Sequence, residues 1–185
     1  MIANVNNAMV YLVGTLLDLL IYVFLLRVLL HAVRADFYNP ISQLVWKLTQ
    51  PIVRPLQSVL PRARSIDLAS VIVLLLVALI DVRAVTYLYG YSLSLLQSGW
   101  FALLKLAMLL LNLYTLTLFV QAILSWVGPG TSNPAANILW SLNEPLLRPV
   151  RRFVPLIAGL DLSPMVVMFV LQLIARLLPI PGLLS

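Results

Sequence analysis

The chain has 185 residues and a formal net charge of +6; 62% of its residues are hydrophobic, 10% are charged, and none is cysteine. A mean hydropathy of +1.04 excludes an ordinary soluble domain, in which about a quarter of the residues are charged, and the missing cysteines exclude disulfides, thiolate metal sites and a cysteine nucleophile. The composition indicates an integral membrane protein whose basic residues face lipid headgroups rather than nucleic acid.

Four apolar runs alternate with proline-rich or uncharged connections. About 20 apolar residues are needed to cross the hydrocarbon layer, and the runs fit that length or come close to it. In chain order we expect a first span at 8–33, a proline loop at 34–65, a second span at 66–89, an uncharged connection at 90–99, a third span at 100–127, a second proline loop at 128–162 and a fourth span at 163–178. The predicted fold class is an all-α membrane protein with four transmembrane helices.

The two proline loops are copies of each other at a fixed offset of 94 residues, without a gap. The pairs matched by identity are Asn39/Asn133, Pro40/Pro134, Trp46/Trp140, Leu48/Leu142, Pro51/Pro145, Arg54/Arg148, Pro55/Pro149, Pro61/Pro155, Asp67/Asp161 and Leu68/Leu162. Such self-similarity indicates a duplicated structural unit. We expect a first repeat at residues 1–90 and a second at 100–185, related in parallel because each contains two spans.

Loop charge predicts the orientation of these repeats. The two proline loops carry eight Lys and Arg residues, whereas residues 90–99 and the last seven residues carry none. Because basic residues concentrate in short cytoplasmic loops, we expect both proline loops in the cytoplasm and both termini in the periplasm.

Each proline loop contains the signals of a short helix. The Asn-Pro pairs at 39–40 and 133–134 suit an N-cap and a first helical position, and apolar residues follow at helical spacing. The prolines at 51 and 145 are expected to end these helices. An amphipathic helix with a tryptophan and basic flanks is typical of the membrane surface, although such a helix could also dip between the spans to form a docking surface or a cavity.

Candidate site residues fall into three groups. The candidate docking or lipid-binding surface comprises Trp46, Arg54, Arg62, Arg64, Trp140, Arg148, Arg151 and Arg152. The candidate structural clamp comprises Asn39, Pro40, Pro51, Pro55, Asp67, Asn133, Pro134, Pro145, Pro149 and Asp161. Each aspartate of the clamp either caps the next span or pairs with the arginine of its own Arg-Pro step, Arg54 or Arg148.

Polar residues within the spans form the third group, because ionisable groups there are costly and are functional candidates by default. It comprises Asp18, Arg27, Asn112 and Gln121. At the repeat offset Asp18 matches Asn112, and the pair could form a polar pocket or an interhelical hydrogen bond. Lys105 is expected to extend to the headgroups. Because His31 is the only histidine, neither a metal nor a cofactor site is predicted.

The motifs of the proline loops resemble the YggT (YlmG) family of small bacterial and plastid membrane proteins, in its two-repeat bacterial form. The residues that carry the resemblance are Asp36 to Pro40, Gln50 to Ile52, Arg54 to Leu56, Pro61, Ile66-Asp67, Trp126 and Glu144 to Arg152. The resemblance implies a bacterial inner-membrane protein without an established activity. It also implies links to osmotic-stress tolerance and potassium uptake, to cell division and to assembly of a cytochrome complex in plastids.

Three functions remain open from the sequence, one of which is a membrane-surface anchor that binds anionic lipid through the arginines of the proline loops, Arg54, Arg62, Arg64, Arg148, Arg151 and Arg152. The chain lacks a phosphate-binding glycine loop, a histidine-containing triad and a zinc-protease motif, so an enzyme is not expected. A membrane accessory, assembly or scaffold protein is favoured, with anionic lipid and other membrane proteins as its partners. The alternative is an oligomeric channel or transport component for ions under osmotic stress, which requires a homo-oligomer because four spans alone make a thin pore.

Overall fold

The computed structural model describes residues 2–58, 60, 67–127, 133–154 and 161–184. Within these ranges the regular structure is entirely helical. The helices are α1 (Ile2–Ala32), α2 (Pro40–Gln57), α3 (Leu68–Leu88), α4 (Leu95–Val127), α5 (Pro134–Val150) and α6 (Ser163–Leu177). The first and third predicted spans are therefore longer than expected, since α1 begins at residue 2 and α4 at residue 95.

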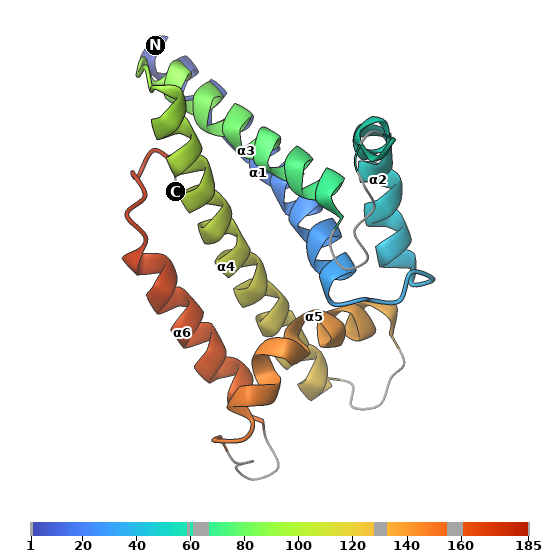
Figure 1. Ribbon diagram of the computed structural model, residues 1–185. Helices are drawn as coiled ribbons and strands as arrows, with labels where there is room; N and C mark the ends of the chain where they lie inside the picture. Colours follow the sequence, from blue (N-terminus) through green and yellow to red (C-terminus); the bar gives the residue numbers. More distant parts are fainter. Residues whose placement is uncertain (1, 59, 61–66, 128–132, 155–160, 185) are drawn as a thin grey trace.

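The long helices form a bundle, and the proline loops form the shorter helices α2 and α5 at one end of it (Figure 1). Helices α1 and α4 run in the same direction toward that end, and α3 and α6 run back. Helix α1 packs against α3, and α4 packs against α3 and α6, while α5 also reaches α1 and α2. The two copies of the repeat therefore contact each other both within the bundle and through their proline helices.

Three helices are long and apolar enough to cross a membrane, at residues 7–32, 68–88 and 95–125. The fourth apolar helix, α6, has only 15 residues, about 22 Å at a rise of 1.5 Å per residue, against a hydrocarbon thickness of about 30 Å. The all-helical fold agrees with the prediction, and its apolar helices are consistent with a multi-pass membrane protein.

The prolines at 51 and 145 do not end their helices, and that prediction is wrong. Helix α2 continues through Pro51 and Pro55, and α5 continues through Pro145 and Pro149. An interior proline costs about 3 kcal/mol because it frees a carbonyl of the preceding turn. All four prolines lie on the exposed side of their helices, where water or headgroups can hydrate the freed carbonyl, while the opposite face stays packed on the bundle.

The helix starts follow the predicted capping chemistry. The side chain of Asn39 accepts a hydrogen bond from the backbone N–H of Ile41, and Asn133 does the same for Ala135. Asn39 also donates its side-chain amide to the backbone carbonyl of Pro134 at 2.8 Å. One capping residue therefore joins the starts of both proline helices.

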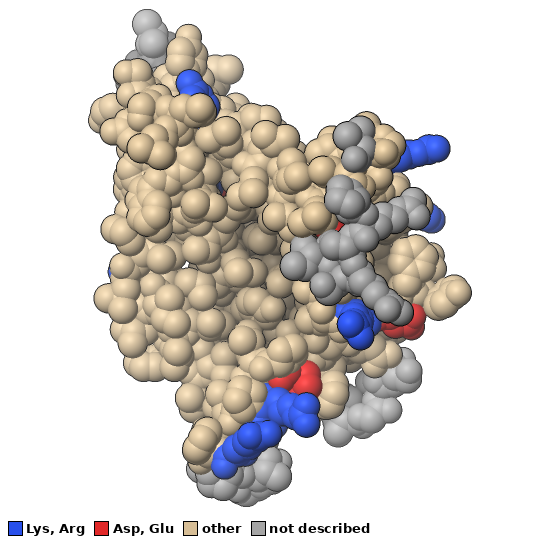
Figure 2. Space-filling view, viewed as in Figure 1, with Lys and Arg blue, Asp and Glu red and all other residues tan. Residues whose placement is uncertain are grey.

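Charged side chains gather at the end of the molecule that carries α2 and α5, whereas the sides of the bundle are almost uniformly uncharged in the same view (Figure 2). This separation is what a bilayer imposes, because an ionised side chain is costly in hydrocarbon and stable among headgroups. The proline helices therefore form the polar end of the molecule.

Candidate functional site

A first polar cluster attaches α2 to the bundle through Arg27 of α1. Arg27 is buried, with 7% of the residue exposed, and its guanidinium makes the contacts. It donates to the hydroxyl of Thr49 at 2.7 Å and to the side-chain oxygen of Gln50 at 2.9 Å, and it forms an ion pair with Asp67 at 3.2 Å. One buried cation thus joins a long helix, a proline helix and the start of α3.

Asp67 is held from several sides. It caps α3 by accepting from the backbone N–H and the hydroxyl of Ser70, and it accepts from the side-chain amide of Gln57. Burial raises the pKa of this carboxyl, but the hydrogen bonds from Ser70 and Gln57 and the charge of Arg27 outweigh burial and lower the pKa below its ordinary value. The carboxylate is therefore ionised at neutral pH.

A second polar cluster holds α5 in the second repeat. The guanidinium of Arg151 donates to Glu144 at 2.7 Å and to Asp161 at 2.8 Å. Burial raises the pKa of Asp161, but hydrogen bonds from Ser163 and Arg151 and the charge of Arg151 lower it overall. The arginine therefore ties the end of α5 to the segment that precedes α6.

Neutral side chains add a second attachment, which joins α5 to α4. The side-chain amide of Asn143 donates to Gln121 at 2.7 Å, and its oxygen accepts from the hydroxyl of Thr117 at 2.8 Å. Asn143 is fully buried, so these two bonds satisfy polar atoms that have no access to water.

The two clusters use equivalent positions, but the cation comes from α1 in the first and from the C-cap of α5 in the second. At the repeat offset, Gln121 occupies the position of Arg27, while Arg151 occupies the position of Gln57. Asp67 and Asp161 are the equivalent acids, and each has an arginine partner. The partners are Arg27 and Arg151, and not the arginines of the Arg-Pro steps that the sequence suggested as the alternative to capping.

An ion triad lies within the bundle, formed by Asp18 of α1, Asp81 of α3 and Lys105 of α4. The ammonium of Lys105 is 2.9 Å from Asp18 and also pairs with Asp81. Asp18 and Asp81 each lie about 14 residues, or roughly 21 Å, from the polar end of their helices. Lys105 is 4% exposed, so the expectation that it extends to the headgroups is wrong: two carboxylates hold it inside.

Asn112 does not directly contact Asp18, its counterpart in the repeat. Tyr22 interacts with both side chains, because it is hydrogen-bonded to Asn112 and lies in the field of Asp18. The direct ion-pair partner of Asp18 is therefore Lys105, which lies in the second repeat.

Most of the candidate docking residues that the structure describes are exposed, but one is held by contacts within the molecule. Trp46 and Trp140 are 42% and 55% exposed, and Arg54, Arg148 and Arg152 are exposed as well. Arg151 is half-buried and is held by its two carboxylate partners, so it is not a free surface group. Arg62 and Arg64 lie outside the described residues.

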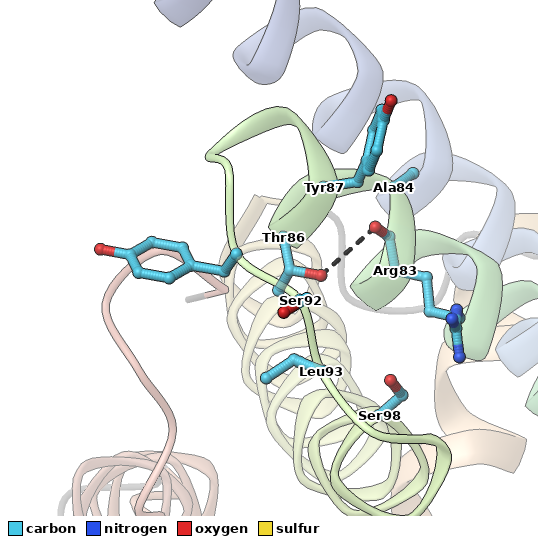
Figure 3. A pocket seen from close by; sticks show the side chains of 8 residues that line it. Arg83, Ala84, Thr86, Tyr87, Ser92, Leu93 and Ser98 are labelled. Atoms are coloured by element: carbon cyan, nitrogen blue, oxygen red, sulfur yellow. Dashed lines mark hydrogen bonds between the residues drawn. The ribbon is translucent and has the colours of Figure 1, made fainter.

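A pocket of roughly 380 Å³ lies far from the proline helices, where the end of α3 meets the start of α4 (Figure 3). Its lining includes Arg83, Tyr87 and Ser98, and the hydroxyl of Thr86 donates to the carbonyl of Arg83. Its lining holds one cation and no carboxylate, so the residues present do not form an acid–base pair. Among the described residues no group of three His, Asp or Glu side chains could hold a metal ion.

Sequence reasoning missed Thr49, Gln57, Asp81 and Asn143, which complete the clusters and the triad. A signal existed for Gln57, because the repeat alignment pairs it with an arginine while Arg27 aligns with a glutamine. That exchange indicates that the two repeats place the same cation at different positions. Asp81 carried no such signal, since its equivalent in the second repeat is an alanine.

The sequence profile of the CCB3/YggT family matches residues 6–88 and 100–181. The chain is 43% identical over 172 residues to an uncharacterized protein of Vibrio alginolyticus, covering 90% of each chain. It is 38% identical over 168 residues to the uncharacterized protein YggT of Escherichia coli K12, covering 91% of this chain and 87% of that one. An uncharacterized protein of Pseudomonas aeruginosa is 38% identical over 176 residues, or 94% and 89% of the two chains. No solved structure matches.

Proposed function

The chain belongs to the CCB3/YggT family, and from that premise we propose that it is a non-enzymatic inner-membrane accessory protein that presents α2 and α5 as a fixed docking surface for larger membrane complexes. In this proposal the bundle crosses the membrane four times as two parallel repeats. The proline helices lie on the cytoplasmic side, and both termini lie in the periplasm.

The observation that carries the proposal is the combination of rigid attachment with outward-facing side chains. A largely buried ion pair fixes α2 to the bundle, and a half-buried one ties the end of α5 to the segment before α6. Trp46 and Trp140 stay exposed on the same helices as exposed arginines. Tryptophan and arginine are enriched among the residues that dominate binding energy at protein interfaces. A surface that is already ordered loses little entropy on binding, which favours docking over a mobile lipid-sampling loop.

The four-span arrangement is supported by the segment after α6. Residues 178–184 continue the chain beyond the short helix, and Leu184 is 3% exposed in the core cluster that contains Val10 of α1. Figure 1 shows this segment running on from α6 toward the end of the bundle where α1 begins. The eight basic residues of the proline loops support a cytoplasmic location for the loops. An alkaline phosphatase fused to the C-terminus should be active in the periplasm, and an inactive but stable fusion would overturn the orientation.

Site-specific photo-crosslinking in living bacteria tests the docking surface. A photoreactive residue placed at Trp46 or Trp140 should give discrete protein adducts, and one placed at Tyr87, which is 80% exposed near the other end of α3, should not. Protein adducts of equal intensity from all three positions would contradict a specific surface. Adducts with lipid alone would instead favour a headgroup anchor.

The ion triad supports a second candidate, an oligomeric component of ion transport. Two carboxylates and one ammonium inside the bundle are typical of residues that line ion or proton pathways. Reconstitution into potassium-loaded liposomes tests this candidate with wild type and Asp18→Asn. Potassium flux that the substitution abolishes would favour transport over docking, and absence of flux from wild type would remove the transport candidate.

A further inference from the structure

The two proline helices are equivalent in sequence but unequal in what they bury. Helix α2 buries one face, formed by Ser42, Val45, Thr49 and Val53. Helix α5 buries the equivalents of the last two, Asn143 and Leu147, and additionally buries Ile138 and Leu142. The second repeat thus uses a stripe of its proline helix that the first repeat leaves uncovered.

That buried stripe of α5 forms the contact between the two repeats. Ile138 and Leu142 are 4% and 1% exposed and pack in one cluster with Leu30 of α1 and Val45 of α2. Leu26 and Leu29 of α1 complete the receiving surface. An apolar stripe on one repeat and an apolar surface on the other therefore define a directional interface.

The reciprocal interface is open. Helix α5 contacts α1, but α2 makes no contact with α4 within the described residues. Leu44 and Leu48, the equivalents of Ile138 and Leu142, are 57% and 58% exposed, and Ile52 continues the same stripe at 45%. We call these three residues of α2 the open stripe.

A matching receiving surface is open on the second repeat. Val120 and Ile123 of α4 are the equivalents of Leu26 and Leu29, and they are 36% and 40% exposed. Because α1 and α4 run in the same direction toward the proline helices (Figure 1), the receiving surface of α4 lies toward the same end of the bundle as that of α1. Each chain therefore displays one unused stripe and one unused receiving surface of an interface that it already forms internally.

We propose that a second copy of this chain covers the open stripe, so that α2 of one copy packs on α4 of the next as α5 packs on α1 within the chain. The contact is heterologous, because different surfaces of the two copies meet. Lipid is the competing neighbour. In lipid, association depends on close packing rather than on apolar burial, and the internal interface shows that side chains of these types at these positions pack closely. The proposal concerns assembly of the chain itself and is independent of its docking to other proteins.

Cysteine crosslinking tests the proposal, because the native chain has no cysteine. Leu48→Cys and Ile123→Cys are introduced singly into two full-length chains with different tags, which are expressed together and oxidised in the membrane. The expected result is a disulfide-linked dimer that carries both tags. The positive control is one chain with Leu29→Cys and Leu142→Cys, the internal equivalents of the same pair, which should crosslink within the chain. The negative control pairs Leu48→Cys with Leu75→Cys, on an exposed position of α3.

Each alternative result overturns the proposal. A dimer formed only between two copies of Leu48→Cys would mean a symmetric contact through α2. Equal crosslinking to Leu75→Cys would mean random collision in the bilayer. No crosslink between chains, while the internal control forms, would mean that the open stripe faces lipid.

Discussion

Arg27 offers the most direct test of how the proline helices are held, because the second repeat shows which residue can stand in its place, Gln121. Arg27→Gln removes the cation from the first polar cluster and leaves Asp67, whose side chain is 15% exposed, without an ion-pair partner. Breaking a buried pair by removing one member costs about 3–5 kcal/mol. We place this loss near 3 kcal/mol, since Ser70 and Gln57 still donate to the carboxylate.

A rescue variant separates the lost ion pair from general damage. Arg27→Gln combined with Gln57→Arg places the cation as in the second repeat, with glutamine in the long helix and arginine at the end of the proline helix, while Gln50 stands where the second repeat has Glu144. If the two clusters are alternative solutions to one requirement, the double variant should recover most of the loss. As a control, Arg54→Gln changes an exposed residue of α2 and should alter the free energy of unfolding by no more than about 0.5 kcal/mol.

Hydrogen exchange of the α2 amides in detergent or nanodiscs is the suitable assay, because detachment of one helix is a local opening. A loss of 3 kcal/mol corresponds to a roughly 150-fold faster exchange for amides that exchange through this opening. Exchange in α5 should change less, since its own cluster stays intact. A double variant that exchanges as fast as Arg27→Gln alone would refute the equivalence of the two clusters.

Other contacts give effects of different size and direction. Lys105→Met leaves two carboxylates in the bundle without their cation and should destabilise it by about 3–5 kcal/mol, whereas Asp18→Asn keeps one ion pair and should cost less; thermal unfolding in detergent ranks the two. Asn39→Ala removes a cap worth about 1 kcal/mol together with the link between the repeats, so it should cost more than Asn133→Ala, and equal costs would mean that the link adds nothing. Because the pKa of Asp67 is lowered in the folded state, its contribution to stability is complete at neutral pH. That contribution is lost as pH falls below the ordinary value of about 3.9 and through the folded pKa. The free energy of unfolding should therefore depend less on pH in Asp67→Asn than in wild type.

Local signals predicted much of the fold. Hydropathy located the long helices, and the Asn-Pro pairs located the starts of α2 and α5, because capping depends on neighbouring residues only. The ends of these helices could not be predicted in the same way. Packing of the face that contains Val45, Thr49 and Val53 outweighs two interior prolines, and that packing depends on residues far away in the sequence.

The candidate site was predictable only in part. The repeat identified Asp67 and Asp161 as a related pair, but their cations come from unrelated positions, so identity between repeats pointed to the wrong arginines. The partners of Lys105 lie on two other helices, and no spacing along the chain shows which helix faces will meet. A charged residue inside an apolar run indicated a candidate site, but the sequence did not indicate which residue it would contact.

The differing origins of the two cations have a consequence for the order in which the chain assembles. Arg151 and Asp161 are 10 residues apart, so the second cluster can close over a short loop as soon as that segment is synthesised. Arg27 and Asp67 are 40 residues apart, and their pairing requires that α1 is already inserted when α3 begins. Short loops close faster and at lower entropic cost than long ones. The ion pair at the end of the second proline helix can thus form within its own stretch of chain, whereas the ion pair that holds the first forms only when α1 and α3 are both in place.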